Sequence, residues 1–146
     1  MVMKDPAYRI LQSYFTALNS KVVVDEVTIP VYTTTPKGTS GNRIEMSIIT
    51  QVDESIKDAY MQDVIVSIDC ITEFTTRGSR KKSVDISNAV IQLIITTFGG
   101  SGLSISGGGY KYIRTSLDNI SALDEITDTK KIYRRILTFT NLIEQI

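Results

Sequence analysis

The feature of this sequence that most limits its possible folds is the alternation of apolar and polar residues over residues 63–74. Val64, Val66, Ile68, Cys70 and Phe74 form one side of this alternation, and Asp63, Ser67, Asp69 and Glu73 lie on the other. Residues two apart point to the same side of an extended chain, so this pattern predicts a strand with one apolar face. Such a face has to be covered by a second layer of structure. The sequence therefore predicts a layered fold built on a sheet.

A second alternating stretch, residues 43–52, predicts another strand, with Ile44, Met46, Ile48 and Val52 on one face. A third strand is expected over residues 22–32, with Val23, Val27, Ile29 and Val31 on one side. Because Pro30 has no N–H to donate, this strand is expected at an edge or beside a bulge. Residues 33–42 (TTTPKGTSGN) are turn-rich. The pattern predicts a long β-hairpin with Lys37 and Gly38 at its tip, where we expect contact with another subunit.

Two stretches predict helices. In residues 5–19, Asp5 suits the cap and Pro6 the first helical position, and Leu11, Phe15 and Leu18 share a face. Residues 83–97 place four apolar residues at helical spacing, namely Ile86, Val90, Leu93 and Ile94. Strands over residues 110–117 and 132–143 complete the order α-β-β-β-α-β-β. We therefore expect a single α+β domain over residues 1–146, with one mostly antiparallel twisted sheet and two helices packed on it.

The composition argues against catalysis and metal binding. The chain has no histidine and one cysteine, Cys70, so structural zinc and an internal disulfide are not expected. The adjacent acids Asp53 with Glu54 and Asp124 with Glu125 diverge in a strand, and we interpret them as solvated loop acids. No apolar stretch reaches the length of a membrane span. We predict no enzyme activity, no catalytic residue, no metal, no cofactor and no contact with a membrane.

Residues 99–109 (GGSGLSISGGG) are rich in glycine. A phosphate-binding loop would need a Lys-Ser or Lys-Thr pair and a following helix, but this run leads into a strand-like segment. A flexible surface loop is one interpretation. The other is a functional loop that becomes ordered on binding, with Gly107, Gly108 and Gly109 as candidate interface residues.

A basic cluster, Arg77, Arg80, Lys81 and Lys82, precedes the second helix. Positive charges at a helix N-terminus oppose the helix dipole, which favours a role in contacting something acidic. We expect these residues to face acids of a neighbouring subunit, such as Asp124, Glu125 or Asp128. Two alternatives stay open: contact with nucleic acid passing nearby, and a merely solvated loop.

The chain resembles the tail-terminator, or tail-completion, family of tailed bacteriophages over most of its length. The resemblance rests on a first helix ending in ALNSKVVVDEV, the long hairpin, the strand DVIVSIDCITEF followed by a basic loop and the helix VDISNAVIQLI, and the closing strand IYRRILTFTNLI. It implies a structural virion protein that forms a homo-oligomeric ring at the head–tail neck or the top of the tail. The family has no catalytic residues to transfer.

The resemblance also implies partners. These are six or twelve copies of the chain itself, the portal or connector, and tail proteins, with genomic DNA passing through the lumen without sequence-specific binding. The implied location is the virion tail or neck, and the host cytoplasm during assembly. Two other functions remain open. One is a nucleic-acid-binding α+β module, with Tyr110-Lys111-Tyr112 and Tyr133-Arg134-Arg135 as its aromatic and basic residues; the other is a small adaptor protein.

Overall fold

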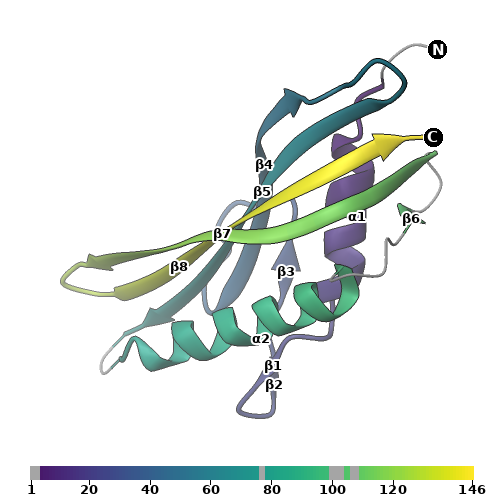
Figure 1. The fold of residues 1–146 in the computed structure, drawn as a ribbon. Coiled ribbons are helices and arrows are strands. Elements are labelled where there is room, and N and C mark those ends of the chain that lie inside the picture. Colours follow the sequence, from purple (N-terminus) through teal and green to yellow (C-terminus); the bar gives the residue numbers. More distant parts are fainter. Residues whose placement is uncertain (1–3, 76–77, 99–103, 106–108) are drawn as a thin grey trace.

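The computed structural model describes residues 4–75, 78–98, 104–105 and 109–146. Its main sheet has the strand order β3-β4-β5-β8-β7-β6 (Figure 1). The four long strands are β4 (Arg43–Asp53), β5 (Tyr60–Phe74), β7 (Tyr110–Ile126) and β8 (Lys131–Gln145), and the short edge strands are β3 (Val31–Tyr32) and β6 (Ser104–Ile105). The helices are α1 (Ala7–Leu18) and α2 (Lys81–Phe98). A separate small hairpin pairs β1 (Val23–Val24) with β2 (Val27–Thr28). The predicted α+β class is confirmed.

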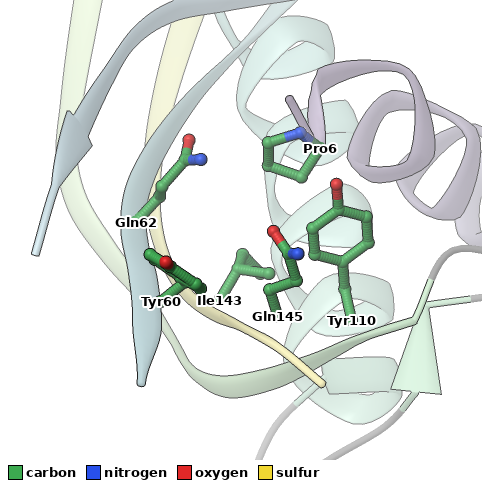
Figure 2. A pocket seen from close by; sticks show the side chains of 6 residues that line it. All are labelled: Pro6, Tyr60, Gln62, Tyr110, Ile143 and Gln145. Carbon is green, nitrogen blue, oxygen red and sulfur yellow. The ribbon is translucent and has the colours of Figure 1, made fainter. Parts of the chain in front are cut away.

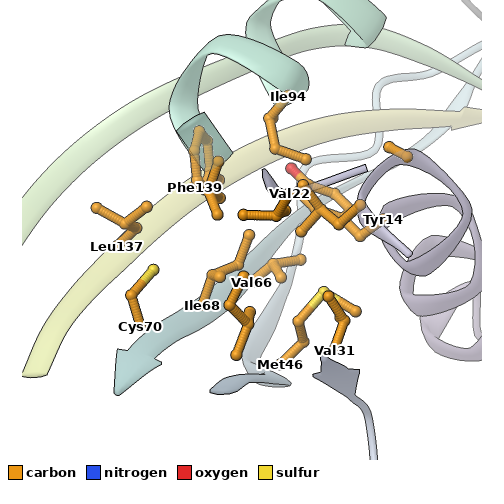
Figure 3. Packing of buried hydrophobic residues seen from close by; sticks show 14 of the residues in the cluster. Tyr14, Val22, Val31, Met46, Val66, Ile68, Cys70, Ile94, Leu137 and Phe139 are labelled. Carbon is orange, nitrogen blue, oxygen red and sulfur yellow. The ribbon is translucent and has the colours of Figure 1, made fainter. Parts of the chain in front are cut away.

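Both helices pack on the same face of the sheet, which we call the covered face. The alternation in β5 directs Val64, Val66, Ile68 and Cys70 to this face, and all four are fully buried. Figure 3 shows Leu137 and Phe139 of β8 beside them, with Tyr14 of α1 and Ile94 of α2 packed on top. The opposite face carries no helix among the described residues, and we call it the uncovered face.

The first helix begins one residue later than predicted, with Pro6 at the cap position, and its buried side includes the predicted Leu18 but otherwise differs from the prediction. The Asp5 carboxylate accepts a hydrogen bond from the Ala7 N–H at 2.9 Å. The fully buried positions include Ile10 and Tyr14, whereas Leu11 and Phe15 are only half-buried. The helix is rotated by about one residue relative to the predicted stripe, about 100°. This rotation brings the Tyr14 hydroxyl to Asn141 of β8, at 2.5 Å from Oδ1.

The strand predicted over residues 22–32 is wrong. Asp25 and Glu26 both have positive φ angles, +51° and +66°, and turn the chain back so that β1 pairs with β2. Such angles suit the tight turns that join twisted antiparallel strands. The turn leaves Val23 and Val27 exposed, contrary to the expected pattern.

The predicted hairpin over residues 22–52 is also wrong. β3 lies parallel to β4, with Val31 opposite Ile44, so residues 33–42 form a crossing connection and not a hairpin tip. Long hairpins do occur elsewhere, as β4–β5 and β7–β8. A bulge between Ile48 and Thr50 changes the register of β4, which leaves Val52 exposed where a buried position was expected.

Candidate assembly surfaces

The described residues offer no enclosed site for a substrate. A cavity of about 10 Å³ lies between the start of α1 and the end of β8. Figure 2 shows its lining residues Pro6, Tyr60, Gln62, Tyr110, Ile143 and Gln145. This volume holds one water molecule at most. Within the described part of the chain, no group of three or more Cys, Asp or Glu side chains could hold a metal ion.

Cys70 is fully buried, and burial raises the pKa of its thiol. It behaves as a small apolar side chain within the core. In the parts of the chain that the structure describes, no helix has the length and apolar character to cross a membrane.

The basic cluster lies at the start of α2, and its described members all have partners within the chain. Arg80 Nη2 is 2.6 Å from Asp124 Oδ2, and the Arg80 guanidinium carbon lies 5.3 Å from the centre of the Tyr133 ring. Lys81 pairs with Asp85 at 2.6 Å, and Lys82 with Asp25 at 3.2 Å. Arg77 lies outside the described residues.

Asp124 and Glu125, which we expected to meet the cluster of a neighbouring copy, have partners within their own chain. Both acids belong to β7 and not to a loop. Asp124 binds Arg80 of its own chain, and Glu125 binds Arg134 of β8 at 3.3 Å. Because α2, β7 and β8 meet at this point, the cluster joins the helix to the sheet.

The local turn before α2 also depends on a close approach of two residues. A Cβ on Gly78 would lie 2.4 Å from Cδ2 of Phe74, closer than any real contact. Phe74 in turn packs against Tyr133, with 6.1 Å between their ring centres. Glycine at this position therefore allows the chain to pass the end of β5 and enter α2 beside Tyr133.

The connection at residues 33–42 has an exposed tip and a fixed base. Lys37 is exposed, and Gly38 has a φ angle of +82° with open space around its Cα. At the base, the Gly41 N–H donates to Glu73 Oε2 at 3.0 Å, and Arg43 Nη1 donates to Glu73 Oε1 at 2.7 Å. The connection thus presents Lys37 at the surface from an anchored position.

Of the glycine-rich run, Gly107 and Gly108 lie outside the described residues, and Gly109 lies at the start of β7. The Gly109 carbonyl accepts a hydrogen bond from the Ile146 N–H at 2.6 Å. Its positive φ angle of +72° suits the turn into the strand. Among the other described residues of the run, Ser104 and Ile105 form β6 and pair with β7.

Two arginine-centred ion clusters cross the uncovered face near one end of the sheet. Arg43 of β4 pairs with Glu45 at 2.9 Å and with Glu73 at 2.7 Å. Arg134 of β8 pairs with Asp69 of β5 and also with Glu125. Cations and anions therefore alternate across four strands and largely neutralise one another, which argues against a general anion-binding surface.

Sequence reasoning missed the second half of β7. Residues 118–130 are all exposed, and Ile120, Leu123 and Ile126 are 44%, 44% and 65% exposed. These apolar residues are three apart, a spacing that suggests a helix more than a strand. The β7 strand carries them because it pairs with β8 all the way to Ile126 and Lys131. We call residues 119–135 the distal hairpin; it ends at the turn between β7 and β8 on the left of Figure 1.

The aromatic residues that a nucleic-acid-binding sheet would use are buried. Tyr110 and Tyr112 face the covered side of the sheet, and Tyr133 packs between Phe74 and Arg80. Base stacking requires an accessible ring face. The two aromatic and basic segments of the sequence therefore do not form such a surface in this structure.

Comparison with known proteins gives a match in structure only. No protein-family model and no curated protein matches the sequence. The fold matches 26 chains of solved structures. One of them belongs to a structure described as the virion of a native gene transfer agent particle. It has a TM-score of 0.64 and 15% sequence identity, and the match covers 94% of this chain and 95% of that chain. At this identity, the likeness shows a shared fold.

Proposed function

We propose that this chain is a structural protein of a phage-like virion, which forms a homo-oligomeric ring at the head–tail neck or at the top of the tail. The observation that carries the proposal is the fold shared with a chain of a gene transfer agent virion, over nearly the full length of both chains. Fold alone does not determine function, so the surfaces of the molecule have to support the same conclusion.

The surfaces support assembly in two ways. The described residues show no group of Cys, Asp or Glu side chains that could hold a metal ion, and their larger hollows, of about 280–370 Å³, are open to solvent. The β7 strand instead carries exposed apolar residues, and both edges of the main sheet include stretches of strand without a neighbouring strand among the described residues. A subunit that joins copies of itself head to tail needs two different contact surfaces, and such contacts close into a ring when the rotation allows it.

The location can be tested with purified particles. A tagged chain expressed with the rest of its particle genes should co-purify with intact particles and label one end of the tail in electron micrographs. Separated heads and tails should both be examined, because a neck protein remains with one of them. A chain absent from washed particles would refute the virion role.

The contact role of the 33–42 connection can be tested by deleting residues 37–40 and closing the gap with two glycines, which keeps the hydrogen bond from Gly41 to Glu73. Lys37 and Gly38 lie at its exposed tip, so the monomer should keep its fold, while joining of heads to tails should fall. A matched control replaces Lys57, which is exposed in a separate loop, with Ala. Normal particle yields from the deletion would remove this connection from the set of contacts.

A further inference from the structure

Each outer edge of the main sheet leaves a stretch of strand without a neighbour among the described residues. β3 pairs with β4 only at Ile44 and Glu45, which leaves residues 46–53 free on their outer side. β6 pairs with β7 only at Lys111 and Tyr110. Beyond the bulges of β7, residues 119–126 form its longest regular stretch, and their outer edge is free.

We propose that residues 119–126 of one copy pair as an antiparallel strand with residues 46–53 of a second copy. This inference rests on the ring proposed above and names the surfaces that would build it. Unpaired strand edges present rows of N–H and C=O groups, which readily accept another strand. The occupant is a second copy because the chain itself offers two complementary edges of this kind.

The strand directions fit this pairing. Each neighbouring pair in the order β4-β5-β8-β7 is antiparallel, so β4 and β7 run in opposite directions. The β7 strand of one copy can therefore meet the β4 strand of the next in antiparallel orientation. Within one copy Met46 is level with Ile120 and Asp53 with Tyr112, so the pairing staggers successive copies along the strands. The ring closes when the strands are inclined to its axis, as strands are in a β-barrel. Each copy then uses both edges, and the contact repeats around a closed ring. Pairing of β7 with a second β7 would stop at a dimer and leave β4 open.

The two segments also match in length and in steric limits. The β3 strand blocks any incoming strand below Met46, and the turn after Ile126 ends the β7 strand. Full overlap therefore places Met46 opposite Ile126, and because the bulge at Ile49 adds one residue to β4, Asp53 then lies opposite Ile120. No shorter overlap would cover both free stretches.

The side chains on the two segments are compatible. The pairing would bring together five exposed apolar residues from two copies, namely Ile49 and Val52 on β4 and Ile120, Leu123 and Ile126 on β7. The acids of the β7 segment, Asp124 and Glu125, are already paired with Arg80 and Arg134, and Asp53 of β4 lies at the opposite end of the overlap. The pairing thus buries apolar side chains without placing like charges opposite each other.

Disulfide cross-linking between two differently sized copies tests this pairing. One copy carries Ser121→Cys, and the other carries Ser47→Cys, Thr50→Cys or Val52→Cys; all four positions are exposed and on the uncovered face. The native Cys70 is buried and does not compete. The overlap places Ser121 opposite Val52, and a disulfide needs Cα atoms about 4.4–6.8 Å apart, so Val52→Cys should cross-link at least about fivefold more than the other two positions. Lys57→Cys, in the exposed loop between β4 and β5, is the matched control.

The outcomes separate the pairing from the ring. Cross-linking of Ser121→Cys mainly with Val52→Cys on the second copy supports the pairing. Dominant cross-linking of Ser121→Cys with itself, or no more cross-linking than the Lys57→Cys control, overturns it, whether or not light scattering shows a ring. The virion role is decided independently by the particle experiment above.

Charge insertion gives a second measure that does not depend on disulfide geometry. Ile120→Lys and Leu123→Lys should raise the concentration needed for assembly at least about tenfold, because the exposed apolar edge would carry an unpaired charge. Ile56→Lys alters an apolar residue that is also exposed, in the loop after β4 and outside both paired segments, and should leave assembly unchanged. Equal assembly of all three variants overturns the proposal, and far-ultraviolet circular dichroism shows whether each variant is folded.

Discussion

The part of the sheet that lies under the helices, which we call the covered part, shares strands with the distal hairpin. Different forces hold the two regions in place. Under the helices, Val66, Ile68, Leu137 and Phe139 are fully buried. In the distal hairpin, the β7 residues are all exposed, and Arg80 and Arg134 form ion pairs with its acids Asp124 and Glu125. Apolar burial contributes about 25 cal/mol per Å², whereas an exposed ion pair contributes about 0–1 kcal/mol. Folding stability therefore comes mainly from the covered part, and the edge of the distal hairpin is available for contacts.

The largest difference between the two regions should appear in truncations to alanine. Phe139→Ala removes a fully buried ring from the core and should lower the free energy of unfolding by about 3–5 kcal/mol. Leu123→Ala in the distal hairpin should change it by less than about 1 kcal/mol, because that side chain is 44% exposed. Urea unfolding of the two variants at equal protein concentration measures both values. Similar losses in both would mean that the hairpin is as much a part of the core as β8.

A second test concerns the buried polar group within the covered part. Asn141 Oδ1 accepts hydrogen bonds from the Tyr14 and Thr115 hydroxyls, at 2.5 and 2.9 Å, and its Nδ2 donates to the Val64 carbonyl at 3.1 Å. Asn141→Leu should cost about 1–3 kcal/mol, because it leaves buried polar groups without partners. In the double variant with Tyr14→Phe, the cost should be smaller than the sum of the two single costs. Strict additivity would contradict a shared network.

Local patterns predicted the elements of the covered part well. The alternation in residues 63–74 and the apolar spacing of residues 83–97 correspond to β5 and α2, because both segments bury one face against the other. The strand at residues 22–32 failed because two consecutive residues with positive φ, Asp25 and Glu26, reverse the chain. Asp25 is a common turn residue, but Glu26 stands at the position where glycine usually signals such a turn.

The candidate contact surface was predicted less well, for reasons that lie in tertiary structure. Arg80 was correctly placed before a helix, but its partner Asp124 is 44 residues away, and nothing local links them. Beyond Lys111 the outer edge of β7 has no partner among the described residues, because β6 begins at Ser104 and reaches only Lys111. An edge is a property of the strand order and not of the strand itself, so the sequence of residues 119–126 could not reveal it.

Acid should weaken the connection between the sheet and the 33–42 segment before it affects the apolar core. Burial opposes ionisation of Glu73, but hydrogen bonds from Arg43 and the Gly41 N–H, with the charges of Arg43 and Lys130, outweigh it and lower the pKa of Glu73 below its usual value. A lowered pKa in the folded state adds stability at pH values above the unfolded pKa of about 4.3, and this stability is lost as the pH falls through the folded value. Glu73→Gln should therefore cost about 1 kcal/mol at pH 7 and flatten the fall in stability between about pH 5 and the acid limit.

The control for this prediction is Glu54→Gln, which changes an exposed acid in the loop after β4. Urea unfolding at several pH values between 3 and 7 measures the slope for each variant. A Glu73→Gln slope that matches that of the wild-type chain would show that the ion cluster of Arg43 does not stabilise the fold.

The smallest expected effect on stability is also the most local. Arg80→Ala removes both the ion pair with Asp124 and the contact with the Tyr133 ring, whereas Lys81→Ala removes only a pair with Asp85 inside α2. The Arg80 side chain is 63% exposed, so its loss should change the free energy of unfolding by less than about 1 kcal/mol.

Local opening is a more sensitive measure, because the hairpin can separate from α2 without unfolding the core. Hydrogen exchange of the amides that join β7 to β8 over residues 119–135 should speed up by a few fold in Arg80→Ala and in 1 M salt, where the screening length is about 3 Å. It should not change in Lys81→Ala. Equal exchange in the two variants would mean that the strand pairing alone holds the hairpin in position, and that the edge offered to a neighbouring copy does not depend on the basic cluster.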